Sequence, residues 1–280
     1  MVKIRDLEKF MSIVEAIILG IIQGATEFLP ISSSGHLVLL PEIFGWGAAD
    51  LTLIGIVHLG TLVAILIYFW RDLWQILAAV LTGIRRRELM GTTDARLGWL
   101  IVIGSIPAVI AGLLLQDFFE QVFAAPQAAA FFLLVTAVLL VIGEKMLSGD
   151  KSAGQMDWKD AGIIGLFQSL ALFPGLSRSG STIVGGLLRG LDRPTATRFS
   201  FLLGIPAFLG AGLLSIKDIV TAPAMPYTTA VYAAGFLSAA VVGYVCIYSL
   251  LRWVRTHSLY IFAVYCALLG GGYLLYSFIT

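Results

Sequence analysis

Residues 23–36 of this chain read QGATEFLPISSSGH. Apolar runs lead into this stretch and out of it, yet it carries a glutamate, a proline, three consecutive serines and a glycine. Proline and Ser/Gly turn formers interrupt a helix, because backbone hydrogen bonds are lost there. Neither apolar piece alone is long enough to cross the ~30 Å hydrocarbon layer of a membrane. The stretch therefore predicts two short helices joined by a turn.

A second broken segment contains PGLSRSGST, residues 174–182. It aligns with the first without a gap at an offset of 145 residues, pairing Gln23 with Gln168 and Ser32 with Ser177. Non-helical backbone at membrane depth is tolerated only when it is buried in protein or faces a water-filled cavity. We therefore predict two re-entrant helix-turn-helix hairpins that line a common cavity.

The rest of the chain is unusually apolar. Over the whole chain, hydrophobic residues make up 59%, which rises to about 70% when the 30 glycines are added, and charged residues make up 12%. Soluble domains have about 45–50% apolar residues with glycine included and about 25% charged residues. Six stretches without Asp, Glu, Lys or Arg are long enough to span a membrane: 51–70, 97–116, 121–143, 199–216, 228–251 and 256–280. The predicted fold is an all-α integral membrane protein, one membrane domain over residues 1–280, with six transmembrane helices plus the two hairpins.

Charge and cysteine content exclude other classes. A net charge of +1 offers no broad basic surface for nucleic acid. Cys246 and Cys266 lie in apolar runs without CxxC spacing, which argues against a disulfide framework or a thiolate metal site.

The two hairpins indicate an internal repeat over approximately residues 10–147 and 155–280. Three predicted spans separate them, an odd number, so the second copy would be inverted relative to the first. Inverted repeats with broken helices place a binding site near the membrane midplane. Chance similarity between apolar, glycine-rich segments is the alternative explanation.

The distribution of Lys and Arg predicts an orientation. With re-entrant hairpins, one face carries thirteen of these residues and the other carries four, namely Lys3, Arg5, Lys9 and Lys217. Cytoplasmic loops are enriched in Lys and Arg. We expect the face with thirteen to be cytoplasmic, both termini to lie outside, and the first hairpin to enter from outside.

Glu27, His36 and Arg178 are ionisable residues in the broken segments, where such residues indicate a functional site. An arginine fork, free backbone amides of helix N-termini and hydroxyls suit a phosphate group, and a carboxylate can hold Mg²⁺ or Ca²⁺ or accept a proton. The alternatives are a purely structural salt bridge between Glu27 and Arg178 and a turn-capping role for the serines.

The two motifs, QxxxEFLPxSSSGH and PGxSRSGxT, closely resemble the signature motifs of the undecaprenyl-diphosphate phosphatases, the bacitracin-resistance family of bacterial membrane proteins. The resemblance covers essentially the whole chain. It implies hydrolysis of undecaprenyl diphosphate to undecaprenyl phosphate and phosphate, which recycles the lipid carrier for peptidoglycan synthesis. It further implies a divalent cation, Mg²⁺ or Ca²⁺, a bacterial inner-membrane location with the active site open to the outer face, and bacitracin as a competitor that sequesters the substrate. A homo-oligomer is left open.

Mapped onto this sequence, the resemblance implies specific roles. The expected catalytic residues are Ser33, Glu27, His36 and Arg178. The expected phosphate ligands are Arg178, Ser177, Ser179, Thr182, Ser32, Ser34 and Gly35. The expected metal ligands are Glu27 and Gln23; the family has Glu or Gln at position 23, so a mechanism with two motif carboxylates is doubtful here.

Two mechanisms use these residues equally well. Ser33 attacks the terminal phosphorus while Glu27 or His36 takes its proton, or water activated at Glu27 attacks directly. A polyprenyl-phosphate flippase or secondary transporter is the alternative function, because inverted repeats with broken helices are typical of transporters.

Overall fold

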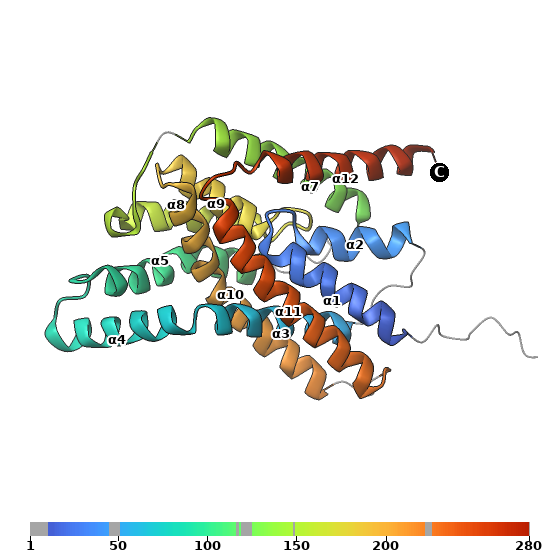
Figure 1. Cartoon of the computed structure of the whole chain (residues 1–280), viewed down its shortest axis with the longest axis horizontal. Coiled ribbons are helices and arrows are strands. Elements are labelled where there is room, and N and C mark those ends of the chain that lie inside the picture. Colours follow the sequence, from blue (N-terminus) through green and yellow to red (C-terminus); the bar gives the residue numbers. More distant parts are fainter. Residues whose placement is uncertain are drawn as a thin grey trace, which may run out of the picture.

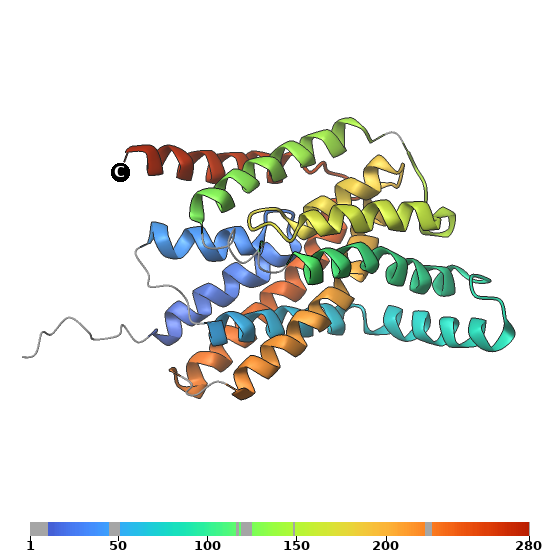
Figure 2. The same ribbon diagram turned by 180° about the vertical axis from the view of Figure 1, so that it is seen from behind.

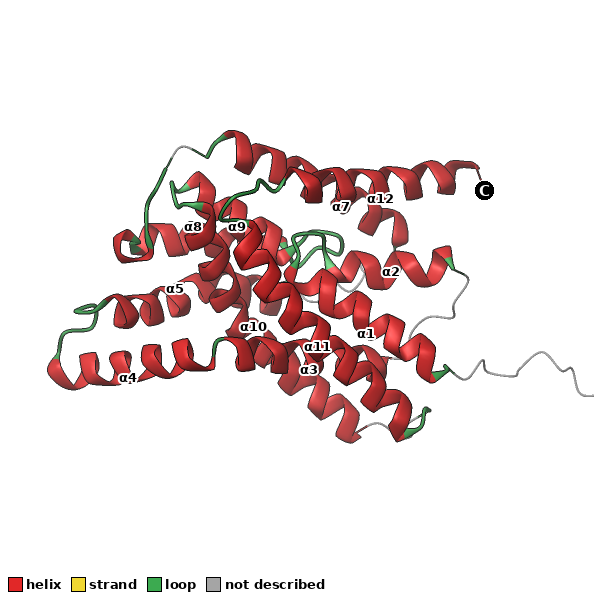
Figure 3. Cartoon of the chain, viewed as in Figure 1, coloured by secondary structure: helices red, strands yellow, loops and turns green. Residues whose placement is uncertain are grey.

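The computed structural model describes residues 11–44, 51–115, 118, 125–147, 149–221 and 226–279. Within these ranges the regular structure is helical (Figure 3), apart from one isolated bridge between Lys151 and Leu191. This confirms the predicted all-α class.

Six helices are long and apolar enough to cross a membrane, as predicted. They are α3 (Leu51–Tyr68), α5 (Thr93–Leu114), α7 (Pro126–Lys145), α10 (Arg193–Thr221), α11 (Thr229–Trp253) and α12 (Tyr260–Ile279). The amphipathic helix α4 (Trp70–Arg86) follows α3 and packs on α5, and the short 3-10 helix η1 (Ala153–Gln155) precedes α8. Residues 121–124, the first four of the third predicted span, lie outside the described residues.

Both broken segments form helix-turn-helix pairs, α1 (Ile13–Phe28) with α2 (Ser33–Ile43) and α8 (Trp158–Leu170) with α9 (Arg178–Leu188). The bounds of α2 and α9 differ by the 145-residue offset at both ends, and the starts of α1 and α8 differ by the same number. The same capping chemistry starts α1 and α8: Ser12 forms a capping box with Glu15, and Asp157 forms one with Asp160. The residue correspondence read from the sequence thus holds for local structure.

The two turns meet near the centre of the molecule, and each hairpin returns toward the end from which it came (Figures 1 and 2). The pairs enter from opposite ends, α1–α2 from the right of Figure 1 and α8–α9 from the left. Helix α1 packs on α11, α8 packs on α5, and α7 packs on α12. Each hairpin therefore packs against spans of the other half. Re-entry into a bilayer and the inverted order of residues 10–147 and 155–280 stay predictions.

Two glycines at the 145-residue offset allow α1 to pack closely on α11 and α8 to pack closely on α5. A Cβ atom on Gly20 would lie 2.4 Å from the carbonyl oxygen of Gly235 on α11. A Cβ atom on Gly165, 145 residues later, would lie 2.3 Å from the carbonyl oxygen of Gly104 on α5. A side chain at either position would separate the backbones, so close packing of helices here requires glycine.

Two buried carboxylates stabilise contacts between helix ends that lie far from the central turns. Glu144 accepts from Arg193 through Nε at 2.9 Å and from the backbone N–H of Leu259 at 2.8 Å, which joins α7, α10 and the start of α12. Asp160 pairs with Lys151 and with Arg189 Nε, the latter at 2.9 Å. Buried charges need partners of this kind, so these contacts account for both carboxylates structurally.

Candidate active site

The two turns have matching hydrogen bonds from a backbone N–H to a serine hydroxyl. Ser32 Oγ accepts the N–H of Gly35 at 3.2 Å, and Ser177 Oγ accepts the N–H of Gly180 at 3.1 Å. Each serine is the N-cap of the second helix of its hairpin, the position at which a hydroxyl satisfies a free amide. Ser32 holds a positive φ of 70°, a conformation that costs free energy for a residue with a side chain and is concentrated at functional sites.

Direct contacts hold the turns against each other. The N–H of Gly175 donates to Ser34 Oγ at 3.3 Å, and Ser179 Oγ donates to the carbonyl oxygen of Leu29 at 3.2 Å. Gly175 has φ +92°, and a Cβ there would lie 2.1 Å from the carbonyl oxygen of Ala129. The second turn can therefore approach α7 only with glycine at this position.

Glu27 is the centre of the cluster. Its Oε2 accepts from Gln23 Nε2 at 2.8 Å and from Ser33 Oγ at 2.6 Å. Its Oε1 lies 3.5 Å from Arg178 Nη2, and the carboxylate side chain is 8% exposed. Gln23 is one helical turn before Glu27, Ser33 comes from beyond the turn, and Arg178 comes from the other hairpin. The tertiary structure thus brings three of the predicted site residues onto the carboxylate of a fourth, Glu27.

Arg178 is held by α10. Its Nη1 donates to the carbonyl oxygen of Ser200 at 3.2 Å, and its guanidinium lies 4.2 Å from the centre of the Phe208 ring. A Cβ atom on Gly204 would lie 2.1 Å from Nη1. An arginine surrounded so closely has few other positions, so its guanidinium is preorganised beside Glu27.

Two polar atoms of this cluster lack hydrogen-bond partners in the described part of the chain. They are Oε1 of Gln23 and Nη2 of Arg178, and both are buried. Nη2 keeps its ion pair with Glu27 Oε1 at 3.5 Å, but the pair has no hydrogen-bond geometry. A buried donor or acceptor without a partner is costly, and each case needs an explanation. A ligand with anionic oxygens would satisfy the arginine, and a cation or a hydroxyl donor would satisfy the amide oxygen. These atoms favour a ligand-binding role over a purely structural salt bridge.

His36 is directed elsewhere. Its Nδ1 lies 2.7 Å from the carbonyl oxygen of Ser32, and its Nε2 lies 2.7 Å from the hydroxyl of Tyr265, whose ring is stacked on the imidazole. A carbonyl oxygen only accepts, so we assign the proton to Nδ1 and an acceptor role to Nε2. Both ring nitrogens are engaged, and neither bonds to Glu27 or Ser33.

The other predicted phosphate ligands form the walls of the turns. Ser32 Oγ and Ser34 Oγ are 3.2 Å apart, as are Ser177 Oγ and Ser179 Oγ. Thr182 is buried, with Oγ1 2.6 Å from Ser200 Oγ and 2.8 Å from the carbonyl oxygen of Arg178. Gly35 contributes the capped backbone amide. The phosphate-binding roles of these residues stay predictions.

Several residues of this region were not predicted from the sequence. Ser200, Gly204 and Phe208 on α10 surround Arg178, Tyr265 on α12 holds His36, and Thr136 on α7 holds the second turn. Thr136 Oγ1 donates to the carbonyl oxygen of Gly175 at 2.9 Å and accepts the N–H of Ser177 at 3.1 Å. A polar residue inside an apolar span could have indicated Ser200, Thr136 and Tyr265. Gly204 and Phe208 carry no such signal.

The residues present fit a hard divalent cation. Glu27 supplies a carboxylate and Gln23 supplies an amide oxygen without a hydrogen-bond partner in the described chain. No group of three or more His, Cys, Asp or Glu that could hold a metal occurs among the described residues. Mg²⁺ is commonly bound by one or two carboxylates together with substrate phosphates, so a small oxygen set agrees with that mode.

The fold and the central cluster define a multi-pass α-helical membrane protein with a preorganised ionic site between two broken-helix hairpins. Residues 16–272 match the family described as Bacitracin resistance protein BacA, and the chain belongs to this family. The family expected from the two motifs is thereby confirmed.

Relatives named undecaprenyl-diphosphatase align over nearly the full chain. The protein of Methanosphaera stadtmanae is 45% identical over 269 residues, covering 93% of this chain and 96% of its own. That of Myxococcus xanthus is 44% identical over 260 residues, covering 93% and 87%. That of Chloroherpeton thalassium is 44% identical over 277 residues, covering 93% and 95%.

Proposed function

We propose that this protein is an undecaprenyl-diphosphatase, which hydrolyses undecaprenyl diphosphate to undecaprenyl phosphate and inorganic phosphate and so returns the lipid carrier to cell-wall synthesis. One geometric observation supports the chemistry above all others. The Ser33 hydroxyl donates to Glu27 at 2.6 Å, and Arg178 pairs with the same carboxylate. A nucleophile bonded to a base, beside a cation for a phosphate, is the arrangement that phosphoryl transfer requires.

In the first step Ser33 Oγ attacks the terminal phosphorus while Glu27 takes the hydroxyl proton. The bond from oxygen to phosphorus forms, the bond to the bridging oxygen breaks, and undecaprenyl phosphate leaves with the bonding electrons. Arg178 and the amides at the N-termini of α2 and α9 neutralise the negative charge on the phosphoryl oxygens. Glu27 then gives the hydroxyl proton to the departing undecaprenyl phosphate and is again a carboxylate. In the second step Glu27 takes a proton from water, the water oxygen bonds to phosphorus, the bond from phosphorus to Ser33 Oγ breaks, and the proton passes to Ser33 as phosphate leaves.

Glu27 is the preferred base, because His36 is bonded to Ser32 and Tyr265 rather than to Ser33. Direct attack by water activated at Glu27 is the second route through the same residues. Gln23 and Glu27 would hold Mg²⁺ or Ca²⁺, which when bound supplies additional positive charge to the diphosphate oxygens.

The proposed orientation follows from the charge distribution of the loops. The α1–α2 hairpin enters from the outer face of a bacterial inner membrane, the active site opens to that face, and both termini lie outside. Bacitracin then competes for substrate on the side where the enzyme acts. A homo-oligomer is compatible with this arrangement.

The names of the relatives favour the hydrolase over a flippase or transporter. The test is release of inorganic phosphate from a C55 lipid diphosphate by the purified full chain in detergent micelles, with and without Mg²⁺ or Ca²⁺. A micelle has no second compartment, so phosphate release can come only from hydrolysis. Lipid movement in vesicles without phosphate release in micelles would support the transporter instead.

A further inference from the structure

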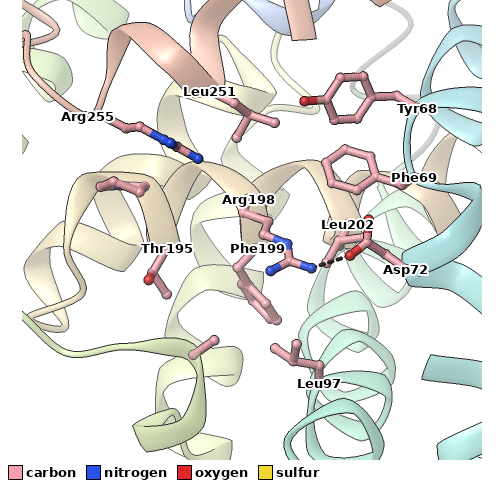
Figure 4. Close-up of a pocket in the computed structure, with 12 residues that line it drawn as sticks. Tyr68, Phe69, Asp72, Leu97, Thr195, Arg198, Phe199, Leu202, Leu251 and Arg255 are labelled. Atoms are coloured by element: carbon pink, nitrogen blue, oxygen red, sulfur yellow. Dashed lines mark hydrogen bonds and ion pairs between the residues drawn. The ribbon is translucent and has the colours of Figure 1, made fainter. Parts of the chain in front are cut away.

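A cavity of about 390 Å³ lies away from the Glu27 cluster. It is formed where the C-terminal ends of α3 and α11 meet the N-terminal ends of α4, α5 and α10 (Figure 4). None of the residues of the Ser33–Glu27–Arg178 arrangement lines it. The proposed phosphatase chemistry therefore leaves this cavity unexplained.

Two arginines line the cavity, one on α10 and one just after the end of α11 (Figure 4). Arg198 on α10 forms an ion pair with Asp72 on α4. Arg255, just after α11, also lines the cavity and forms no ion pair within the described part of the chain. The hydroxyls of Thr195 and Tyr68 complete the polar lining. With one carboxylate against two guanidinium groups, the lining carries a net positive charge.

The remaining walls are apolar. Phe69, Leu97, Phe199 and Leu202 are all buried core residues that face the cavity. A free hydrated ion gains nothing from such walls. An anion attached to hydrocarbon would bury apolar surface against them while its charge meets the arginines.

Aromatic rings separate the cavity from the proposed active site. The ring of Phe69, which lines the cavity, lies 6.4 Å from the ring of Phe201, and Phe201 lies 5.7 Å from Phe28, the residue after Glu27. Occupancy of the cavity therefore does not require contact with Glu27 or Arg178.

We propose that this cavity binds the phosphate headgroup of an anionic membrane lipid, with Arg255 as its main ligand. Guanidinium groups bind phosphate oxygens through paired N–H donors, and basic pockets between membrane helices bind anionic lipid headgroups. The helix ends that form the cavity also carry the basic residues assigned to the cytoplasmic face, where anionic lipids concentrate. The occupant is a structural lipid rather than the substrate.

The test is native mass spectrometry of the purified full chain in detergent, titrated with dioleoylphosphatidylglycerol or with the zwitterionic dioleoylphosphatidylcholine. We expect phosphatidylglycerol to bind more tightly than phosphatidylcholine. Arg255→Gln should weaken the binding of phosphatidylglycerol about tenfold, which is the effect of losing one charged hydrogen-bonding partner. The matched control is Arg252→Gln, because Arg252 lies one turn earlier, outside the cavity, over the ring of Tyr248. Ala153→Leu, which adds volume inside the cavity, should also weaken binding.

Inorganic phosphate added at the lipid concentration distinguishes a lipid from a free ion. Binding of phosphatidylglycerol that survives this competitor supports the proposal, whereas its displacement would show a free-phosphate site and overturn the lipid assignment. The lipid assignment would also be overturned if Arg255→Gln and Arg252→Gln lost the same affinity for phosphatidylglycerol. Equal affinity of the wild type for the two lipids would overturn it as well. Phosphate release in micelles should be unchanged in Arg255→Gln, so this test is independent of the proposed hydrolysis.

Discussion

Ser33 and Arg178 occupy equivalent positions, the first residues of α2 and α9, and both contact Glu27. The position equivalent to Glu27 in the second hairpin is Leu172. The two hairpins are therefore alike in their helix bounds and different in their chemistry. One hairpin supplies the carboxylate and a hydroxyl, and the other supplies the guanidinium, so the two turns form one ionic cluster.

The first prediction concerns the nucleophile. Ser33→Ala should abolish turnover and Ser33→Cys nearly so, because the hydroxyl bonded to Glu27 is removed or replaced. Ser32→Ala and Ser34→Ala should retain measurable turnover, since loss of one donor to a phosphate typically costs ~10²–10³ in rate. Substrate labelled in its terminal phosphate should leave a quench-trappable label on the wild type and none on Ser33→Ala. About a hundredth of wild-type turnover in Ser33→Ala, with no trapped label, would instead favour direct attack by water.

The second prediction concerns the cation. Arg178→Lys should lose most of its activity although the charge is kept, because an ammonium group cannot reproduce a planar two-point grip on a phosphate. The lysine ammonium is also a single point charge, so it cannot contact both the Ser200 carbonyl oxygen and the Glu27 carboxylate as the guanidinium does. Phosphate release is the measurement, with monodispersity in detergent as the folding control. Wild-type turnover in Arg178→Lys would return Arg178 to a purely structural role.

The third prediction uses a residue that touches no substrate. Gly204→Ala should lower turnover by about the same ~10²–10³ as loss of a phosphate donor, because the new methyl group occupies the position of Arg178 Nη1 and displaces the guanidinium. Gly210→Ala is the matched control on the same helix, since a Cβ there meets nothing within 4 Å. Equal activities of the two variants would contradict the view that α10 positions Arg178.

The fourth prediction concerns orientation. In a background without Cys246 and Cys266, Thr228→Cys should react with an impermeant maleimide added outside intact cells, and Ser152→Cys should not. Both positions are exposed, so a difference in labelling reports the side of the membrane. Labelling of Ser152→Cys from outside would overturn the inverted relation of the two halves.

Much of the site could be predicted from the sequence because its parts are local. Gln23 and Glu27 share a helix face by spacing, and the Pro30 break returns Ser33 to the carboxylate within six residues. The 145-residue repeat placed Arg178 at the matching turn. The sequence left His36 open as a base beside Glu27. The direction of its ring depends on the hydrogen bond to Tyr265, 229 residues away, which spacing along the chain cannot predict.

The six apolar spans, the two broken segments and the family could all be predicted from the chain alone, because apolar runs, turn residues and motifs are local properties. The enclosure of Arg178 by Gly204, Ser200 and Phe208, and the cavity shared by Arg198 and Arg255, appear only in the folded molecule. Such contacts depend on how each helix is rotated about its axis and where it crosses its neighbours. That information is set by close packing of side chains over the whole molecule, so no single segment carries it.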